Sequence, residues 1–165
     1  MSAAISGHGV FLFPLPHYIR LRRRAGRHRA GGEPAAGARD VIHELKTRGR
    51  PYCVASSGKF EKMRFTLGMT GLLPLVEDVL FSAEEVRAGK PAPDLFLHAA
   101  SRMGHEPSRC PVIEDSVPGV QAAVAAGMPV IGYAGDPLTD AAALENEGAH
   151  VISEMGALID LLELG

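Results

Sequence analysis

The chain has 165 residues, 46% of them hydrophobic and 22% charged, which is enough for one globular domain with a buried core. Its net charge of −2, and the lack of any apolar run near the roughly 20 residues of a membrane span, exclude bulk recruitment to nucleic acid or to a bilayer. We therefore expect no nucleic-acid partner and no membrane partner. The two cysteines, Cys53 and Cys110, are too few for a disulfide framework and are predicted to be buried thiols in a reducing, cytoplasmic compartment.

The basic charge is concentrated at the start of the chain. Residues 1–33 contain six arginines, no lysine and one acid, Glu33, for a net charge of +5, so the other 132 residues carry −7. Glycine, proline and alanine follow without apolar periodicity. This composition predicts a poorly ordered basic segment over residues 1–36, with a strand at 9–13, ahead of a folded domain over residues 37–165. A nucleic-acid arm or an organelle transit peptide would also be basic, but serine is scarce and no amphipathic helix is evident, so a plain basic tail is preferred.

Past residue 36, short apolar runs alternate with amphipathic segments, the pattern of a parallel sheet with crossover helices. Strands are predicted at 52–55, 79–81, 111–113, 130–132 and 150–152. Helices are predicted at the stripe formed by Val41, Ile42 and Leu45, at 60–67, 93–103 and 117–126, and after Ser153. Right-handed crossovers then give an α/β fold, a three-layer α/β/α Rossmann-like core.

Polar residues follow three of these predicted strands. Ser56 and Ser57 come directly after the first, Lys90 lies in the loop after the second, and Glu114 and Asp115 follow the third. In a doubly wound sheet, ligands bind beyond the carboxyl ends of the strands. We therefore expect Ser56, Lys90 and Asp115 to converge at one edge of the sheet.

Each of these groups has a chemical and a purely structural interpretation. Adjacent carboxylates such as Glu114 and Asp115 suit Mg²⁺, whereas Asp115 with Ser116 would also cap the following helix. Lys90, flanked by glycine and prolines, would neutralise a phosphate and a nearby carboxylate, or would be an ordinary exposed loop lysine. Ser56 and its neighbouring serine would donate hydrogen bonds to a phosphate at a helix N-terminus, or would be N-cap residues.

Together and in this order, these segments resemble the haloacid dehalogenase-like hydrolases, in their β-phosphoglucomutase-like and phosphoglycolate-phosphatase-like subgroup. The matching stretches are CVASS at 53–57, GKPAPD at 89–94, VIEDSVPG at 112–119 and QAAVAAGM at 121–128. The resemblance implies phosphate binding by Ser56, Ser57 and Lys90, with catalytic roles for Ser56 and Lys90. It also implies Mg²⁺ as cofactor on Asp115, with Glu114 binding it directly or through water. The stretches LFLHAA at 95–100 and AGDP at 134–137 look like the sugar-phosphate phosphatase branch, so the expected partner is a small phosphorylated metabolite.

The sequence departs from this family at the first motif. The family carries an Asp-x-Asp-Gly run at the end of its central strand, where the first Asp is the nucleophile and the second the general acid/base. No Asp precedes Asp40 here, and Pro14 and Pro16 would take the two positions if 9–13 is the central strand. The substrate-selecting cap that the family inserts after this motif is missing or cut to a few residues. A frame-shifted, mis-started or alternative-exon origin of the first 33 residues is a second explanation.

Two functions follow from the resemblance and its departure. One is Mg²⁺-dependent hydrolysis of a small phosphomonoester, impaired in this chain by the missing nucleophile. The other is a catalytically silent domain that binds phosphate, metal or a partner. A phospho-receiver domain is rejected, because its lysine comes last whereas the order here is Ser56, Lys90, Asp115. The oligomeric state and the individual substrate are not predicted.

Overall fold

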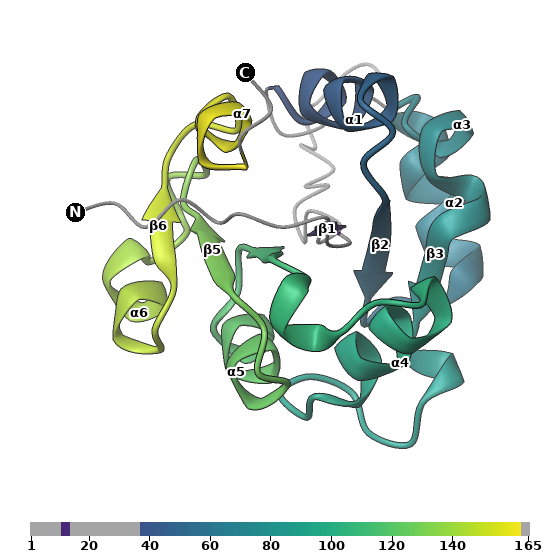
Figure 1. Cartoon of the computed structure of the whole chain (residues 1–165). Helices are drawn as coiled ribbons and strands as arrows, with labels where there is room; N and C mark the ends of the chain where they lie inside the picture. The colour runs from purple at the N-terminus through teal and green to yellow at the C-terminus, as the bar shows by residue number, and fades with distance from the viewer. Residues whose placement is uncertain (1–10, 14–36, 163–165) are drawn as a thin grey trace, which may run out of the picture.

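The computed structural model of the chain describes residues 11–13 and 37–162. They form a six-stranded sheet in which every strand is parallel to its neighbours, in the order β3-β2-β1-β4-β5-β6 (Figure 1). The strands are β1 (Phe11–Phe13), β2 (Tyr52–Ser56), β3 (Leu80–Ser82), β4 (Val112–Glu114), β5 (Val130–Tyr133) and β6 (His150–Ile152). The predicted parallel α/β fold is confirmed.

β1 occupies the centre of the sheet. Leu12 lies beside Cys53 of β2 on one side and beside Val112 of β4 on the other. The chain runs outward from β1 to β3 on one side and from β4 to β6 on the other, so the strand order reverses between β1 and β4. Ligands of doubly wound sheets bind at such a switch point. The rest of the predicted strand 9–13, the positions of Pro14 and Pro16, and the basic segment lie outside the described residues.

Helices cover both faces of the sheet. The face of α1 (Ala38–Thr47), α2 (Phe60–Met69), α3 (Leu73–Val76) and α7 (Ala157–Leu161) is packed around Leu45, Met63 and Leu158. The face of α4 (Asp94–Met103), α5 (Val117–Ala125) and α6 (Ala141–Asn146) is packed around Phe96, Val120 and Leu144. The two layers lie on opposite sides of the sheet in Figure 1. The strands alternate between the two clusters because successive side chains of a strand point to opposite faces.

Some local predictions differ from the structure. The strands predicted at 79–81 and 111–113 are each shifted by one residue, to Leu80–Ser82 and Val112–Glu114. Ser153 does not cap the last helix, which begins after Gly156 without a side-chain cap. α3 and α6 were not predicted, because they have four and six residues and too few turns for an apolar stripe. Asp140 caps α6, where its Oδ1 accepts a hydrogen bond from the Ala143 amide at 3.0 Å.

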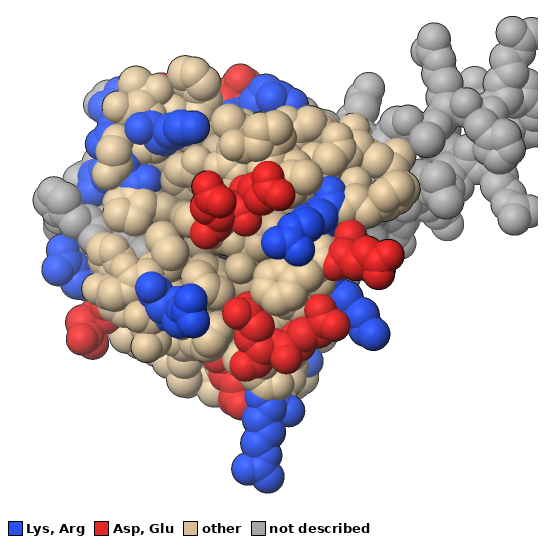
Figure 2. Space-filling model, turned by 90° about the vertical axis from the view of Figure 1, so that its right-hand side faces the viewer, with Lys and Arg blue, Asp and Glu red and all other residues tan. Residues whose placement is uncertain are grey.

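Both cysteines are buried free thiols, as predicted. Burial, with a smaller contribution from Cys110, raises the pKa of the Cys53 thiol well above its usual value. Within the described residues, no helix combines the length and the apolar character that a membrane span needs. On the face seen in Figure 2, Lys and Arg side chains are interspersed with Asp and Glu. That face therefore lacks the one-sided basic patch that is typical of a nucleic-acid site.

Candidate functional site at the carboxyl edge of the sheet

Buried polar side chains gather where β2, β3 and β4 end. Of the four polar or charged residues that are buried in the described part of the chain, three are the last residues of these strands. They are Ser56, Ser82 and Glu114. Burying a polar group is costly unless it is hydrogen-bonded, so this edge must contain the partners of all three.

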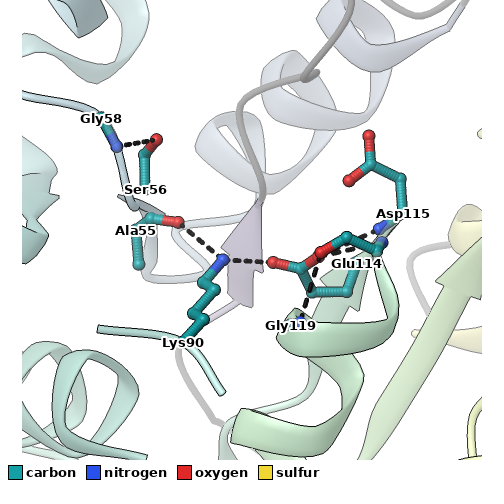
Figure 3. A network of polar contacts seen from close by, with 8 residues as sticks. Ala55, Ser56, Gly58, Lys90, Glu114, Asp115 and Gly119 are labelled. Carbon is teal, nitrogen blue, oxygen red and sulfur yellow. Dashed lines mark hydrogen bonds and ion pairs between the residues drawn. The ribbon is translucent and has the colours of Figure 1, made fainter. Parts of the chain in front are cut away.

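Lys90 reaches this edge from the loop between β3 and α4. Its side chain is only 3% exposed and forms an ion pair with Glu114. The ammonium also donates to the Ala55 carbonyl at 3.5 Å and lies 4.6 Å from the centre of the Phe96 ring. Figure 3 shows Nζ between the Ala55 carbonyl and the Glu114 carboxylate. An ordinary exposed loop lysine is thereby excluded, and the positive charge is fixed between the ends of β2 and β4.

Glu114 is fully buried and both of its carboxylate oxygens accept hydrogen bonds from this chain. Oε1 accepts from Lys90, whereas Oε2 accepts from the amides of Asp115 and Ser116, each at 3.2 Å, and from the Ser116 hydroxyl at 2.9 Å. Gly119 leaves the room for this carboxylate, because a Cβ at that position would lie 2.0 Å from its carbon. This geometry favours a role in holding Lys90.

Asp115 is half-buried, and its carboxylate points away from the Lys90–Glu114 pair (Figure 3). The helix cap beside it is Ser116, whose Oγ accepts from the Gly119 amide at 3.2 Å. Asp115 also affects the pKa of Tyr133, at the end of β5. Burial, then Asp136, then Asp115 raise the pKa of the Tyr133 hydroxyl. Asp115 therefore does not join the Lys90–Glu114 pair, which lies between the ends of β2 and β4.

Ser56 closes β2 and is 8% exposed. Its Oγ accepts a hydrogen bond from the Gly58 amide at 3.1 Å, which leaves its own proton to be donated. Ser57 is exposed. Neither serine is the N-cap of α2, which is Lys59, and the Lys59 side chain makes no capping hydrogen bond. The expected N-terminal phosphate position is also partly taken, because the Phe60 amide donates to Glu84 Oε2 at 3.0 Å.

The structure thus places Ser56, Lys90, Glu114 and Asp115 at the carboxyl edge of the sheet, together with residues that the sequence analysis did not name. Ser82, Glu84 and Gly119 were not singled out, although all three contact the predicted loops or residues. One signal was available for Ser82, which begins the Ser-x-x-Glu pattern of a capping box with Glu85. Gly119 closes the matching stretch at 112–119, but the reason for a glycine there depends on where the Glu114 carboxylate lies.

A family model of the haloacid dehalogenase-like hydrolases matches residues 14–127 of the chain. The chain belongs to this family. The match spans all three predicted motifs, from the serine loop to Asp115 and α5, and confirms the resemblance drawn from the sequence.

Several relatives of the chain are phosphatases of small molecules. It is 38% identical over 87 residues to 6-phosphogluconate phosphatase of Escherichia coli, matching 53% of this chain and 39% of that one. It is 50% identical over 92 residues to the fructose-1-phosphate phosphatase YqaB of E. coli, matching 56% and 48%. It is 41% identical over 95 residues to a bifunctional riboflavin kinase/FMN phosphatase of Arabidopsis thaliana, matching 58% and 25%. The chain thus spans half or less of the length of these three relatives.

Solved structures of the family share the fold. A HAD family hydrolase from Deinococcus radiodurans, with bound phosphate and sodium, has a TM-score of 0.74 at 34% identity, covering 81% of this chain and 61% of that one. A putative beta-phosphoglucomutase from Thermotoga maritima has a TM-score of 0.72 at 26% identity, covering 79% and 60%. These similarities confirm the Rossmann-like core and include the β-phosphoglucomutase-like group.

Haloacid dehalogenase-like hydrolases generally use Mg²⁺, so the donors at this edge need to be tested against that ion. Within residues 11–13 and 37–162, no group of three or more His, Cys, Asp or Glu side chains is placed to hold a metal. Both oxygens of Glu114 are engaged by the chain's own donors, and no Asp precedes Asp40 in the sequence. This donor set does not fit a metal site made of several protein carboxylates.

Proposed function

We propose that this chain binds the phosphate group of a small phosphomonoester, of the sugar-phosphate type, at the carboxyl edge of the sheet. The observation that carries the proposal is the buried ammonium of Lys90, fixed beside the end of β2. Lys90 neutralises the phosphate charge, and the Ser56 hydroxyl and the loop of Ser57 donate hydrogen bonds to its oxygens. The phosphatase relatives support the substrate class.

Turnover is proposed to be negligible in this chain. Hydrolysis through an aspartyl-phosphate needs a carboxylate in line with phosphorus, and the sequence after β1 runs Pro14, Leu15, Pro16 with no Asp before Asp40. Without the second Asp of the motif, the leaving alcohol is not protonated, which costs roughly 10²–10⁴-fold in rate by itself. Lys90 and Ser56 then bind and orient the phosphate, and the covalent route is closed.

Asp115 is the residue proposed to contact Mg²⁺, and Glu114 is proposed to hold Lys90 instead of the ion. Mg²⁺ keeps several waters and binds through one or two carboxylates together with phosphate oxygens. With a single carboxylate, we expect weak Mg²⁺ binding that increases when phosphate is present. Phosphate binds to Lys90 and Ser56 without the ion, and Mg²⁺ increases the phosphate affinity by the same factor as phosphate increases the affinity for Mg²⁺.

The second candidate is Mg²⁺-dependent hydrolysis of the same phosphomonoesters. It is favoured by the relatives, which are named as phosphatases of 6-phosphogluconate, fructose 1-phosphate and hexitol phosphates. It requires a nucleophile other than the family's Asp. The two candidates share the phosphate site and differ only in whether the bound ester is cleaved.

Binding and turnover measurements on the purified chain separate the two candidates. Titration with inorganic phosphate should show saturable binding that Lys90→Met abolishes. Assays with p-nitrophenyl phosphate and sugar phosphates, with and without Mg²⁺, should show no turnover above background. Mg²⁺-dependent turnover of about 1 s⁻¹ or more, lost in Asp115→Ala, would establish the second candidate and a substitute nucleophile. Absence of phosphate binding to the wild-type chain would refute both.

A further inference from the structure

We infer that Ser82 and Glu84 are positioning residues for the phosphate loop, defined here as residues 56–58. This inference rests on the proposed function, because it concerns how the proposed phosphate ligands are held. Neither residue faces a substrate position directly. Both act by fixing the main chain of the loop that follows β2.

The Ser82 hydroxyl ties the end of β3 to the phosphate loop. Ser82 pairs in register with Ser56, and its side chain is fully buried. Its Oγ donates to the Gly58 carbonyl at 2.8 Å and accepts from the Glu84 amide at 3.1 Å. Gly58 in turn donates its amide to Ser56 Oγ. A hydrogen-bonded path therefore runs from Ser82 through Gly58 to the hydroxyl that is proposed to bind phosphate.

The Glu84 carboxylate fixes the start of α2, directly after the phosphate loop. Its Oε2 accepts from the Phe60 amide at 3.0 Å, at the first residue of α2. The loop is thus held at the Gly58 carbonyl and at the Phe60 amide by two side chains of one short segment. A carboxylate at a helix N-terminus is also favoured by the helix dipole. Both bonds join residues 24 positions apart in the chain, so they fix tertiary position and not local helix geometry alone.

The same short segment also begins the loop that carries Lys90. The 3₁₀ helix η2 (Ala83–Glu85) is itself rigidified by a capping box, in which Glu85 Oε2 accepts from the Ser82 amide at 2.9 Å. The segment Ser82–Glu85 therefore leads into the Lys90 loop and is hydrogen-bonded to Gly58 and Phe60. Two groups that must bind the same phosphate are positioned relative to each other by Ser82 and Glu84. Small displacements of such groups weaken binding strongly, because preorganisation is lost.

The proposal requires Glu84 to act as a hydrogen-bond acceptor and not as a charge. A carboxylate near the phosphate loop repels an anionic ligand, so its charge does not help binding. An amide oxygen accepts the same bond from Phe60 without that charge. Glu84→Gln should therefore keep or improve phosphate binding, whereas Glu84→Ala should weaken it. If Glu84 acted only through its charge on the helix dipole, Glu84→Gln and Glu84→Ala would change phosphate binding equally.

Glu61 provides a matched control within the same helix. It is an exposed acid in the first turn of α2, as Glu84 is an exposed acid at that helix end. Within residues 37–162, Glu61 forms no hydrogen bond with the phosphate loop, whereas Glu84 accepts one from the Phe60 amide. Removing Glu61 changes the charge near the helix N-terminus without releasing Gly58 or Phe60. It should lower stability less than removing Glu84, which also loses the hydrogen bond to the Phe60 amide, and it should leave phosphate binding unchanged.

The experiment titrates the full chain with inorganic phosphate and follows the backbone amides of Gly58 and Phe60 by ¹H–¹⁵N NMR. We expect Glu84→Ala and Ser82→Ala each to weaken phosphate binding about 10-fold, with displaced Gly58 and Phe60 resonances in the ligand-free chain. Glu84→Gln and Glu61→Ala should bind phosphate at least as tightly as the wild type, and melting temperatures should show all four variants to be folded.

Three results would overturn the inference. They are wild-type affinity in Glu84→Ala, equal weakening in Glu61→Ala, and a Glu84→Gln variant as weak as Glu84→Ala. If the wild-type chain itself fails to bind phosphate, the proposed function fails. The unliganded Gly58 and Phe60 resonances of Glu84→Ala still decide whether the residue positions the loop. The two failures are therefore distinguishable.

Discussion

The two edges of the sheet differ in whether their polar side chains are buried or exposed. At the carboxyl ends of β2, β3 and β4, the chain buries Ser56, Ser82 and Glu114 and supplies each with a hydrogen-bond partner. At the amino ends lies an open hollow of about 310 Å³. Its lining includes Lys46, Arg50, Tyr52, Glu77, Asp78 and Met103, of which Lys46, Glu77 and Asp78 are exposed. The charges of Lys90 and Glu114 are paired and enclosed at the carboxyl edge, whereas these three exposed charges lie in solvent at the amino edge.

This contrast shows where substitutions should matter most. A buried charge that loses its partner is strongly destabilising, whereas exposed charged pairs contribute little. The carboxyl edge therefore combines the proposed phosphate site with buried polar groups whose loss should lower the free energy of unfolding strongly. The amino edge should tolerate substitutions with small effects on stability and none on phosphate binding.

The largest effect is expected for Glu114→Ala. The variant leaves the Lys90 ammonium buried without its carboxylate, which should lower the free energy of unfolding by about 3–5 kcal/mol. Urea denaturation measures the loss. The double variant with Lys90→Met should be more stable than Glu114→Ala alone, because the unpaired charge is then gone. A loss below about 1 kcal/mol in the single variant would mean that this edge is no more sensitive than the surface.

A slightly smaller effect is expected for Gly119→Ala. The added methyl group would lie 2.0 Å from the Glu114 carboxylate carbon, so the carboxylate must leave its position under α5. Overpacking of this kind typically costs about 1–3 kcal/mol, and the upper end is expected here. Gly68→Ala, within α2, is the control, because its Cβ meets only Leu73 at 3.9 Å. Alanine should be neutral or stabilising there, and equal melting temperatures for the two variants would contradict the close-packing argument.

Between the two edges, Cys53 should make stability depend on alkaline pH. Burial raises the pKa of this thiol in the folded chain, so the unfolded chain releases the proton first as pH rises. The protonated thiol contributes its full stabilisation below the pKa that it has in the unfolded chain. As the pH rises above that value, the free energy of unfolding falls by at most about 1.4 kcal/mol per pH unit. The free energy of unfolding of the wild type, compared with Cys53→Ala from pH 7 to 10, should fall more steeply above about pH 8.5. Parallel curves would show that the thiol ionises freely in the fold.

The smallest effect is expected at the amino edge, for Tyr52→Phe. The variant loses one hydrogen bond, from the Tyr52 hydroxyl to the Leu75 carbonyl at 2.7 Å, which is worth about 1 kcal/mol. Phosphate affinity should be unchanged, because Tyr52 lies at the opposite end of β2 from Ser56. A change in phosphate affinity comparable to that of Lys90→Met would remove the distinction between the two edges.

The fold was predictable from the sequence because buried strands and helices have characteristic patterns of apolar residues. Cys53 and Ala55 pack on one face of β2 and Val54 on the other, so the strand is apolar throughout, as strands covered on both faces are. Ser56, Lys90 and Asp115 were predictable as candidates because each follows a strand in a parallel sheet. α6 has no such apolar pattern, because Leu144 is its one buried residue.

Contacts between distant segments were the part that the sequence did not reveal. The pairing of Glu114 with Lys90 depends on where two side chains meet, and periodicity carries no information about that. The same holds for Glu84, whose partner Phe60 lies 24 residues away. The Lys90 loop could be identified by its glycine and prolines, but its burial at the sheet edge became evident only from the packing around Phe96.

The central position of β1 has a consequence for how this chain folds. Main-chain pairing between the β2–β3 pair and the β4–β5–β6 group passes entirely through β1. The pairing of Leu12 with Val112 joins residues 100 positions apart, so the sheet closes across a very long loop. Contacts of such sequence separation slow folding, because the entropy of loop closure is lost before the pairing is gained. We expect the two half-sheets to form first, from local crossovers, and their union through β1 to be the slow step of folding.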